Sequence, residues 1–274
     1  MLASRLLVAI VLLPLGAWVI ALGGFPFTAV VAAMSALAAW EVARMLRKAG
    51  FRVSELGMPL GAALVVIAFY LQRHEGAAFA LTFILLGSMT LHLFDFEQRG
   101  RQQAATDYAA SVMGMVYCGW LASYMVALRN LPEGKWWFLI ALPSVWLADS
   151  GAYLIGRRWG KHLFAPRLSP HKTWEGYIGG LMSGALSGWV LAALWGFGAG
   201  PESVIVPWKG AILGLLLAAL TPLGDLGESM IKRQVGVKDS GYILPGHGGI
   251  FDRIDSWLWG GVLGYYLVLW WLGR

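Results

Sequence analysis

Long apolar runs follow one another along almost the whole chain, and they limit the fold more than any other feature of the sequence. A helix that crosses a bilayer needs about 20 mostly apolar residues, and runs of this kind recur between short polar breaks. Hydrophobic residues make up 58% of the 274 residues and charged residues only 13%, so a water-soluble fold could not cover the apolar surface. The sequence therefore predicts an all-α polytopic membrane protein with about nine transmembrane helices.

The nine candidate spans are separated by charged or Gly/Pro-rich breaks. They lie at 6–22, 25–45, 58–71, 77–94, 108–128, 136–155, 174–197, 211–225 and 256–272. The third and eighth are short, which leaves eight spans as an alternative. The first could be a signal peptide, but it has a single basic residue, Arg5, and no convincing cleavage site, so we expect a retained helix. We expect one integral membrane domain over 1–274, with N-terminal helices at 1–135 and a C-terminal part at 136–274.

Lysine and arginine are distributed unevenly between the predicted loops. With the N-terminus inside, five of the 21 lie outside: Arg73, Arg129, Lys135, Lys209 and Arg274. Cytoplasmic loops of membrane proteins are enriched in Lys and Arg. The two most polar loops, 157–173 and 226–255, are therefore predicted to face the cytoplasm, and the expected location is the cytoplasmic (inner) membrane of a bacterium.

The residue inventory disfavours several chemistries. The single cysteine, Cys118, allows neither an intramolecular disulfide nor a cysteine-based metal cluster. The spacing of His162, His171 and His247 matches no familiar zinc site. The sequence contains no P-loop and no Gly-x-Ser-x-Gly elbow, and we expect no nucleic acid as a partner.

A carboxylate, a hydroxyl and an amine share one face of the helix that continues the eighth span. At 3.6 residues per turn, Asp225, Ser229 and Lys232 are predicted on the same side. A carboxylate at the edge of the hydrocarbon is costly and typically marks a functional site. Lys232 and Arg233 have a simpler alternative, because basic side chains at a helix end also extend toward anionic headgroups.

A glycine-rich segment precedes the last span. Gly248 and Gly249 follow His247 and let the backbone approach a ligand closely, as loops that hold phosphate require. Four basic side chains could supply positive charge for a polyphosphate: Lys232, Arg233, Lys238 and Arg253.

Several carboxylates are candidates for a metal site. Asp252 and Asp255 lie one turn apart where the last helix is predicted to begin, although acidic residues there also complement the helix dipole. Together with Asp225 they form an oxygen-rich set that suits a hard cation such as Mg²⁺. Asp149 lies inside the sixth span, where a carboxylate rarely lacks a function; the alternative is a packing hydrogen bond with Ser150 or Tyr153.

The segment 169–176 is predicted to start a helix. Ser169 is a suitable N-cap and Pro170 suits the first helical position. Capping does not require Lys172, which is then available to meet an anion at the helix N-terminus.

These polar residues fall into three motifs of the C-terminal half. The longest combines Ser229-Met-Ile-Lys232-Arg233, Lys238-Asp239, Pro245, His247-Gly248-Gly249 and Asp252-Arg253-Ile-Asp255. The others are Asp149-Ser-Gly-Ala-Tyr153 with Gly156-Arg157 and Gly160-Lys161-His162, and Ser169-Pro-His-Lys-Thr-Trp-Glu-Gly176. Over about residues 146–256 they resemble the motifs of phosphatidate cytidylyltransferases, also called CDP-diacylglycerol synthases. One departure is His171, which stands where a lysine is expected.

The resemblance implies transfer of a cytidylyl group from CTP to phosphatidate in phospholipid biosynthesis, giving CDP-diacylglycerol and pyrophosphate, with Mg²⁺ and room for a second cation. It implies metal ligands at Asp149, Asp225, Asp252 and Asp255. Catalytic roles are implied for Asp225, Ser229, Lys232, His247 and Asp252. Substrate contacts are implied for Lys161, Lys172, Arg233, Lys238, Gly248, Gly249 and Arg253.

The active site is expected at the cytoplasmic ends of the C-terminal helices, where it can meet both CTP and membrane lipid. Monomer and homodimer both remain open. The alternative function is a transporter of phosphorylated solutes, whose intramembrane carboxylates would couple ion movement. That reading expects two related halves, whereas the polar residues here lie in the second half.

Overall fold

The computed structural model describes residues 14–200, 202–243 and 248–273. The predicted first span, 6–22, lies partly outside these residues, and His247 lies outside them altogether; residues 14–22 are helical. The chain divides into two compact units, one of Met1–Ala127 with Ile231–Ile254 and one of Leu128–Met230 with Asp255–Arg274. The single domain expected over 1–274 stays a prediction.

The first unit is a set of packed helices. It contains α2 (Gly24–Lys48), α3 (Gly57–Arg99), α4 (Ala104–Met115), the π-helical turn η1 (Val116–Trp120) and most of α5 (Leu121–Arg129). Fully buried small residues on α2, such as Ala38 and Ala39, let the neighbouring helices approach closely.

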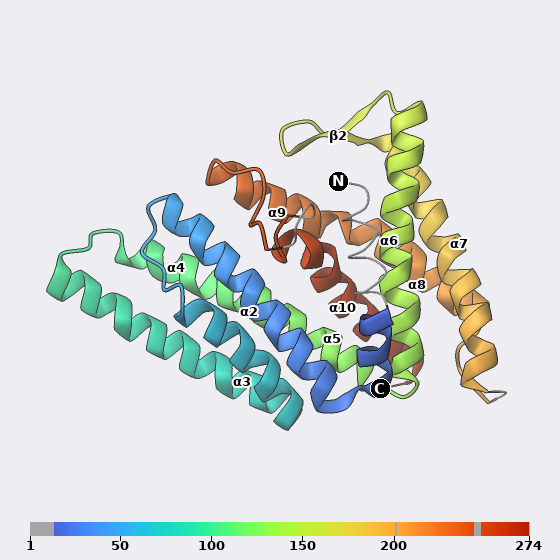
Figure 1. Ribbon diagram of the computed structural model, residues 1–274, viewed down its shortest axis with the longest axis horizontal. Coiled ribbons are helices and arrows are strands. Elements are labelled where there is room, and N and C mark those ends of the chain that lie inside the picture. Colours follow the sequence, from blue (N-terminus) through green and yellow to red (C-terminus); the bar gives the residue numbers. More distant parts are fainter. Residues whose placement is uncertain (1–13, 201, 244–247, 274) are drawn as a thin grey trace. The chain divides into compact units, whose positions relative to one another are not determined.

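The helix α3 consists of two segments. Gln72 and Arg73 have non-helical backbone angles, and Arg73 has φ 56°. The segments run in opposite directions (Figure 1). The break lies between the predicted spans 58–71 and 77–94, so the sequence placed this interruption correctly.

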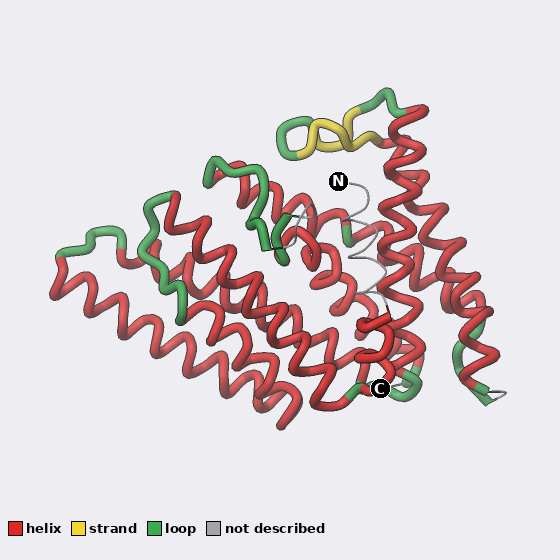
Figure 2. The backbone as a smooth tube through the Cα atoms, in the orientation of Figure 1, coloured by secondary structure: helices red, strands yellow, loops and turns green. Residues whose placement is uncertain are grey.

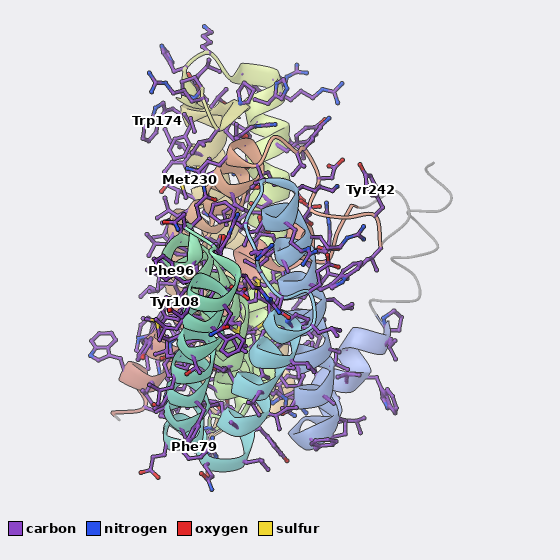
Figure 3. The ribbon with its side chains drawn as sticks, turned by 90° about the vertical axis from the view of Figure 1, so that its left-hand side faces the viewer. Phe79, Phe96, Tyr108, Trp174, Met230 and Tyr242 are labelled. Carbon is purple, nitrogen blue, oxygen red and sulfur yellow. The ribbon has the colours of Figure 1, made fainter. Side chains whose placement is uncertain are left out.

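The outer face of the second α3 segment is apolar. Phe79, Phe83 and Leu86 are exposed by 65%, 57% and 61%, and Figure 3 shows Phe79 and Phe96 along this helix. A water-soluble surface rarely carries so long an apolar stripe, whereas a surface in contact with lipid requires it.

Six helices among the described residues are long and apolar enough to cross a membrane: Gly24–Lys48, Gly57–Arg99, Ala104–Arg129, Gly134–Trp159, Trp174–Ala199 and Pro207–Gln234. The prediction of a polytopic, helical membrane protein is thereby confirmed. The count of nine spans stays a prediction.

The second unit is built around α6 (Gly134–Trp159), α7 (Trp174–Ala199) and α8 (Pro207–Leu220), and it shares α9 (Pro222–Gln234) and α10 (Phe251–Trp271) with the first unit. Glycines recur at every fourth position of α7, at 176, 180, 184 and 188. A Cβ on Gly180 would lie 3.3 Å from the carbonyl oxygen of Ala148 on α6, and one on Gly188 would collide with the backbone of Gly210 on α8. Glycine therefore sets the close packing of the three helices.

A short hairpin lies between α6 and α7 and corrects one prediction. Strands β1 (Leu163–Ala165) and β2 (Ser169–Thr173) pair antiparallel before α7, and Figure 2 shows them in yellow. Strands of three and five residues leave the fold predominantly helical. The helix start at Ser169 and Pro170 was wrong, because those residues lie in β2 and the side chain of Thr173 caps α7 by accepting from the N–H of Gly176.

Candidate active site

Asp225 lies close to Asp255 because α9 and α10 meet at a glycine. A Cβ on Gly224 would lie 2.7 Å from the carbonyl oxygen of Asp255 and 2.7 Å from Cδ1 of Trp259. Any side chain at this position would push the helices apart. Gly224 therefore sets the approach that brings the residue after it to the first turns of α10.

Three carboxyl groups converge at this contact. Oxygen atoms of Asp225, Glu228 and Asp255, here called the Asp225 cluster, all lie within 4.8 Å of one another. Glu228 and Asp255 are buried, with 1% and 7% of their surface exposed, and Asp225 is half-buried. Carboxylates so close together repel unless they share a proton or a cation. Oxygen ligands of this kind suit a hard divalent cation.

One lysine and a fourth carboxylate accompany the cluster. Nζ of Lys172 donates to Oδ2 of Asp225, and Asp149 on α6 interacts electrostatically with both residues. Asp149 also interacts electrostatically with Asp255. Four acidic side chains and one lysine therefore gather here, and such an oxygen-rich group could hold a divalent cation.

The β-hairpin holds Lys172 in place. Glu175, in the first turn of α7, accepts hydrogen bonds from the backbone N–H groups of Lys161 and His162 at 3.0 and 3.2 Å. It also pairs with Nδ1 of His162 at 2.5 Å. These bonds tie the segment before β1 to the start of α7. Lys172 points to Asp225 from β2, whereas the neighbouring His171 is exposed.

A second group of polar residues lies in the first unit and centres on Glu41. This carboxylate of α2 is 1% exposed and accepts three hydrogen bonds. The donors are the backbone N–H groups of Ile250 at 3.0 Å and Phe251 at 2.8 Å, and Oγ of Ser240 at 2.9 Å. Glu41 therefore holds both the loop after α9 and the beginning of α10.

Asp252 secures the same loop from the first turn of α10. It accepts from Nζ of Lys232 at 2.8 Å, from the N–H and Oγ of Ser240 at 3.1 and 3.0 Å, and from the N–H of Gly249 at 2.8 Å. A Cβ on Gly249 would collide with Ser240 and Glu41. The glycine predicted to approach a phosphate thus approaches two carboxylates, and its N–H group is already engaged.

The predicted site residues therefore divide between two clusters. Asp225 and Asp255 meet, with Asp149 and Lys172 nearby. Asp252 and Lys232 pair with each other. Of the remaining candidates, Ser229 is half-buried, Gly248 has φ +79°, and four basic side chains are exposed: Lys161, Arg233, Lys238 and Arg253.

Two acidic residues of these clusters were not among the site residues predicted from the sequence. Glu228 follows Asp225 by three residues, so helical spacing alone indicated a shared face. Glu41 lies inside the predicted span 25–45, where a carboxylate is itself a signal of function. Its partners lie about 200 residues away along the chain, and no local pattern identifies them.

The chain is similar to known proteins over almost its whole length. The sequence pattern of the cytidylyltransferase family matches residues 3–271. A protein of Synechocystis sp. named phosphatidate cytidylyltransferase is 32% identical, with 97% of this chain and 96% of the relative aligned. Proteins of the same name from Brucella suis and Mycobacterium bovis are 34% and 32% identical, over 93% and 84% of this chain and 88% and 76% of theirs. The chain therefore belongs to the cytidylyltransferase family.

Proposed function

We propose that this protein transfers the cytidylyl group of CTP to phosphatidate, giving CDP-diacylglycerol and pyrophosphate. The names of relatives that align with almost the whole chain support the two substrates. The observation that carries the proposal is the Asp225 cluster, three carboxyl groups gathered at α9 and α10. The membrane-spanning helices around it suit a reaction on a lipid that does not leave the bilayer.

The cluster fits a magnesium ion, which we propose is held by Asp225, Glu228 and Asp255 with Asp149 close by. When bound there, Mg²⁺ would neutralise phosphate charge and favour attack on phosphorus. Asp252 was predicted as a further ligand. Because it already accepts from Lys232, Ser240 and Gly249, we propose that it acts by holding the loop.

In the proposed reaction, a phosphate oxygen of phosphatidate forms a bond to the α-phosphorus of CTP. The bond from that phosphorus to the oxygen bridging to the β-phosphorus breaks, and pyrophosphate leaves. Lys172 lies beside the Asp225 carboxylate, so its ammonium group can neutralise a phosphate that approaches the cluster. Positioning and charge neutralisation supply most of the catalysis in such transfers.

The substrates can be tested with the purified protein in detergent. We expect a cytosine-containing lipid, detected by mass spectrometry of the organic phase, only when CTP and phosphatidate are both present. A protein that consumes CTP equally well without phosphatidate would refute the proposal.

Removal of divalent cations is expected to abolish turnover. EDTA should reduce CDP-diacylglycerol formation to background, and excess Mg²⁺ should restore it, because the acidic cluster cannot neutralise a triphosphate by itself. The measurement is initial rate against free Mg²⁺ concentration. Full turnover in EDTA, with metal content verified by elemental analysis, would contradict the metal role.

We also propose that the hairpin and the loop after α9 face the cytoplasm. In a Cys118→Ala background, Arg167→Cys and Tyr242→Cys should resist an impermeant thiol reagent in intact cells and react after permeabilisation. Both positions are exposed, Tyr242 by 84% (Figure 3). Glu202→Cys, between α7 and α8, is the matched control and should react in intact cells. The opposite pattern would reverse the orientation.

A further inference from the structure

A pocket of about 400 Å³ opens between the C-terminal end of α2 and the loop that follows α9. Its α2 side is formed by Trp40, Glu41, Arg44, Met45 and Lys48, and its other side by residues 237–243. All of these residues belong to the first unit. The volume falls in the usual range for small-molecule sites, roughly 300 to 1,000 Å³.

Three basic side chains gather at the pocket. Arg44, Lys48 and Lys238 line it, and none of them forms an ion pair within the described parts of the chain. Arg44 and Lys48 are four residues apart, so they lie on the same face of α2. Arg47, one residue away, faces elsewhere and pairs with Glu55 at 3.0 Å.

The acidic residues of the pocket do not cancel this charge. Glu41 lies at its buried side and already accepts from Ile250, Phe251 and Ser240. Asp239 is the other acidic residue of the lining. Three cations therefore face one carboxylate that is not engaged by the fold. The guanidinium of Arg44 lies 4.7 Å from the centre of the Trp40 ring, which holds it in a defined position.

We propose that this pocket binds a phosphate group of a substrate through Arg44 and Lys48, two residues outside the family motifs, together with Lys238. The inference rests on the proposed function, which supplies two phosphate-bearing ligands of the same chemistry. One is the triphosphate of CTP, and the other is the phosphomonoester of phosphatidate. Arginine and lysine bind such groups through charge-assisted hydrogen bonds.

The test compares Arg44→Gln and Lys48→Gln with Arg47→Gln, which removes the same charge from the same end of α2 outside the pocket. Binding of labelled CTP is measured by equilibrium dialysis in neutral detergent without phosphatidate. KM is then measured for each substrate. Thermal unfolding confirms that each variant is folded.

We expect each of the two pocket variants to lower the affinity for one of the two ligands roughly 10- to 100-fold. Arg47→Gln should bind both ligands about as well as wild type. Weaker CTP binding assigns the pocket to the triphosphate. Unchanged CTP binding with a raised KM for phosphatidate assigns it to the lipid phosphate.

Unchanged CTP binding and unchanged KM for both substrates would overturn the inference, and so would an equal loss of affinity in Arg47→Gln. The basic side chains would then be interpreted as contacts to the headgroups of bulk lipid. A failure of the proposed function is recognised separately. In that case the wild type forms no CDP-diacylglycerol, whereas the CTP-binding comparison can still be made. A wild type that binds neither ligand would overturn the pocket inference as well.

Discussion

Asp225→Asn is expected to lower turnover at least 100-fold, about 2.7 kcal/mol of activation free energy, while the protein remains folded. The substitution preserves the shape of the side chain and removes one negative charge from the Asp225 cluster. An amide oxygen is a weaker ligand for a divalent cation than a carboxylate oxygen. The substitution also removes the ion pair between Asp225 and Lys172. The measurement is the initial rate of CDP-diacylglycerol formation at saturating CTP and phosphatidate.

Glu202→Gln is the matched control for this experiment. Glu202 lies in the same unit as Asp225 but is exposed between α7 and α8, so its loss should leave turnover unchanged. A folded Asp225→Asn variant that keeps more than about a tenth of wild-type turnover, a loss below about 1.4 kcal/mol, would remove Asp225 from the catalytic machinery.

Glu41→Ala is expected to cause the largest loss of stability. The substitution leaves the N–H groups of Ile250 and Phe251 without their acceptor, whereas the hydroxyl of Ser240 can still donate to Asp252. Each buried donor without a partner costs about 1 to 3 kcal/mol, so the loss from the two N–H groups is at least about 2 kcal/mol. We expect a clear decrease in the unfolding temperature in detergent and loss of turnover, because the loop and the start of α10 lose their common anchor.

Glu41→Gln separates the contribution of the hydrogen bonds to stability from the contribution of the negative charge. It keeps one acceptor oxygen, so we expect a stability between wild type and Glu41→Ala. Glu55→Gln is the control on a half-buried carboxylate that pairs with Arg47 at 3.0 Å; it should change the unfolding temperature little. A Glu41→Ala protein as stable as wild type would show that this buried carboxylate does not hold the loop.

The helices were predictable because their signal is local. A run of about 20 apolar residues is sufficient to indicate a spanning helix, and the runs 25–45 and 174–197 lie within α2 and α7. The polar break between 58–71 and 77–94 indicated the interruption at Gln72 and Arg73. Asp225 was also predictable, because a carboxylate at the edge of an apolar run has an energetic cost that demands an explanation.

The groupings of side chains were less predictable because they depend on contacts between distant segments. Ser169 and Pro170 have the local pattern of a helix start, yet pairing with β1 places them in a strand. Asp252 and Asp255 are three residues apart, but one pairs with Lys232 and the other joins the Asp225 cluster. Sequence spacing therefore indicated candidates such as Asp252 and Asp255 but not the partners that each would contact.

We propose that this chain moves the α-phosphate of CTP, with its cytidine, onto phosphatidate. The most direct test supplies the purified protein with phosphatidate, Mg²⁺ and CTP labelled either at the α- or at the γ-phosphorus. We expect the α-label to enter the lipid phase and the γ-label to appear in water as pyrophosphate, in equal amounts, and we expect Asp225→Asn to lose both signals. Transfer of the γ-label to lipid, or α-label that never leaves the aqueous phase, would contradict this proposal.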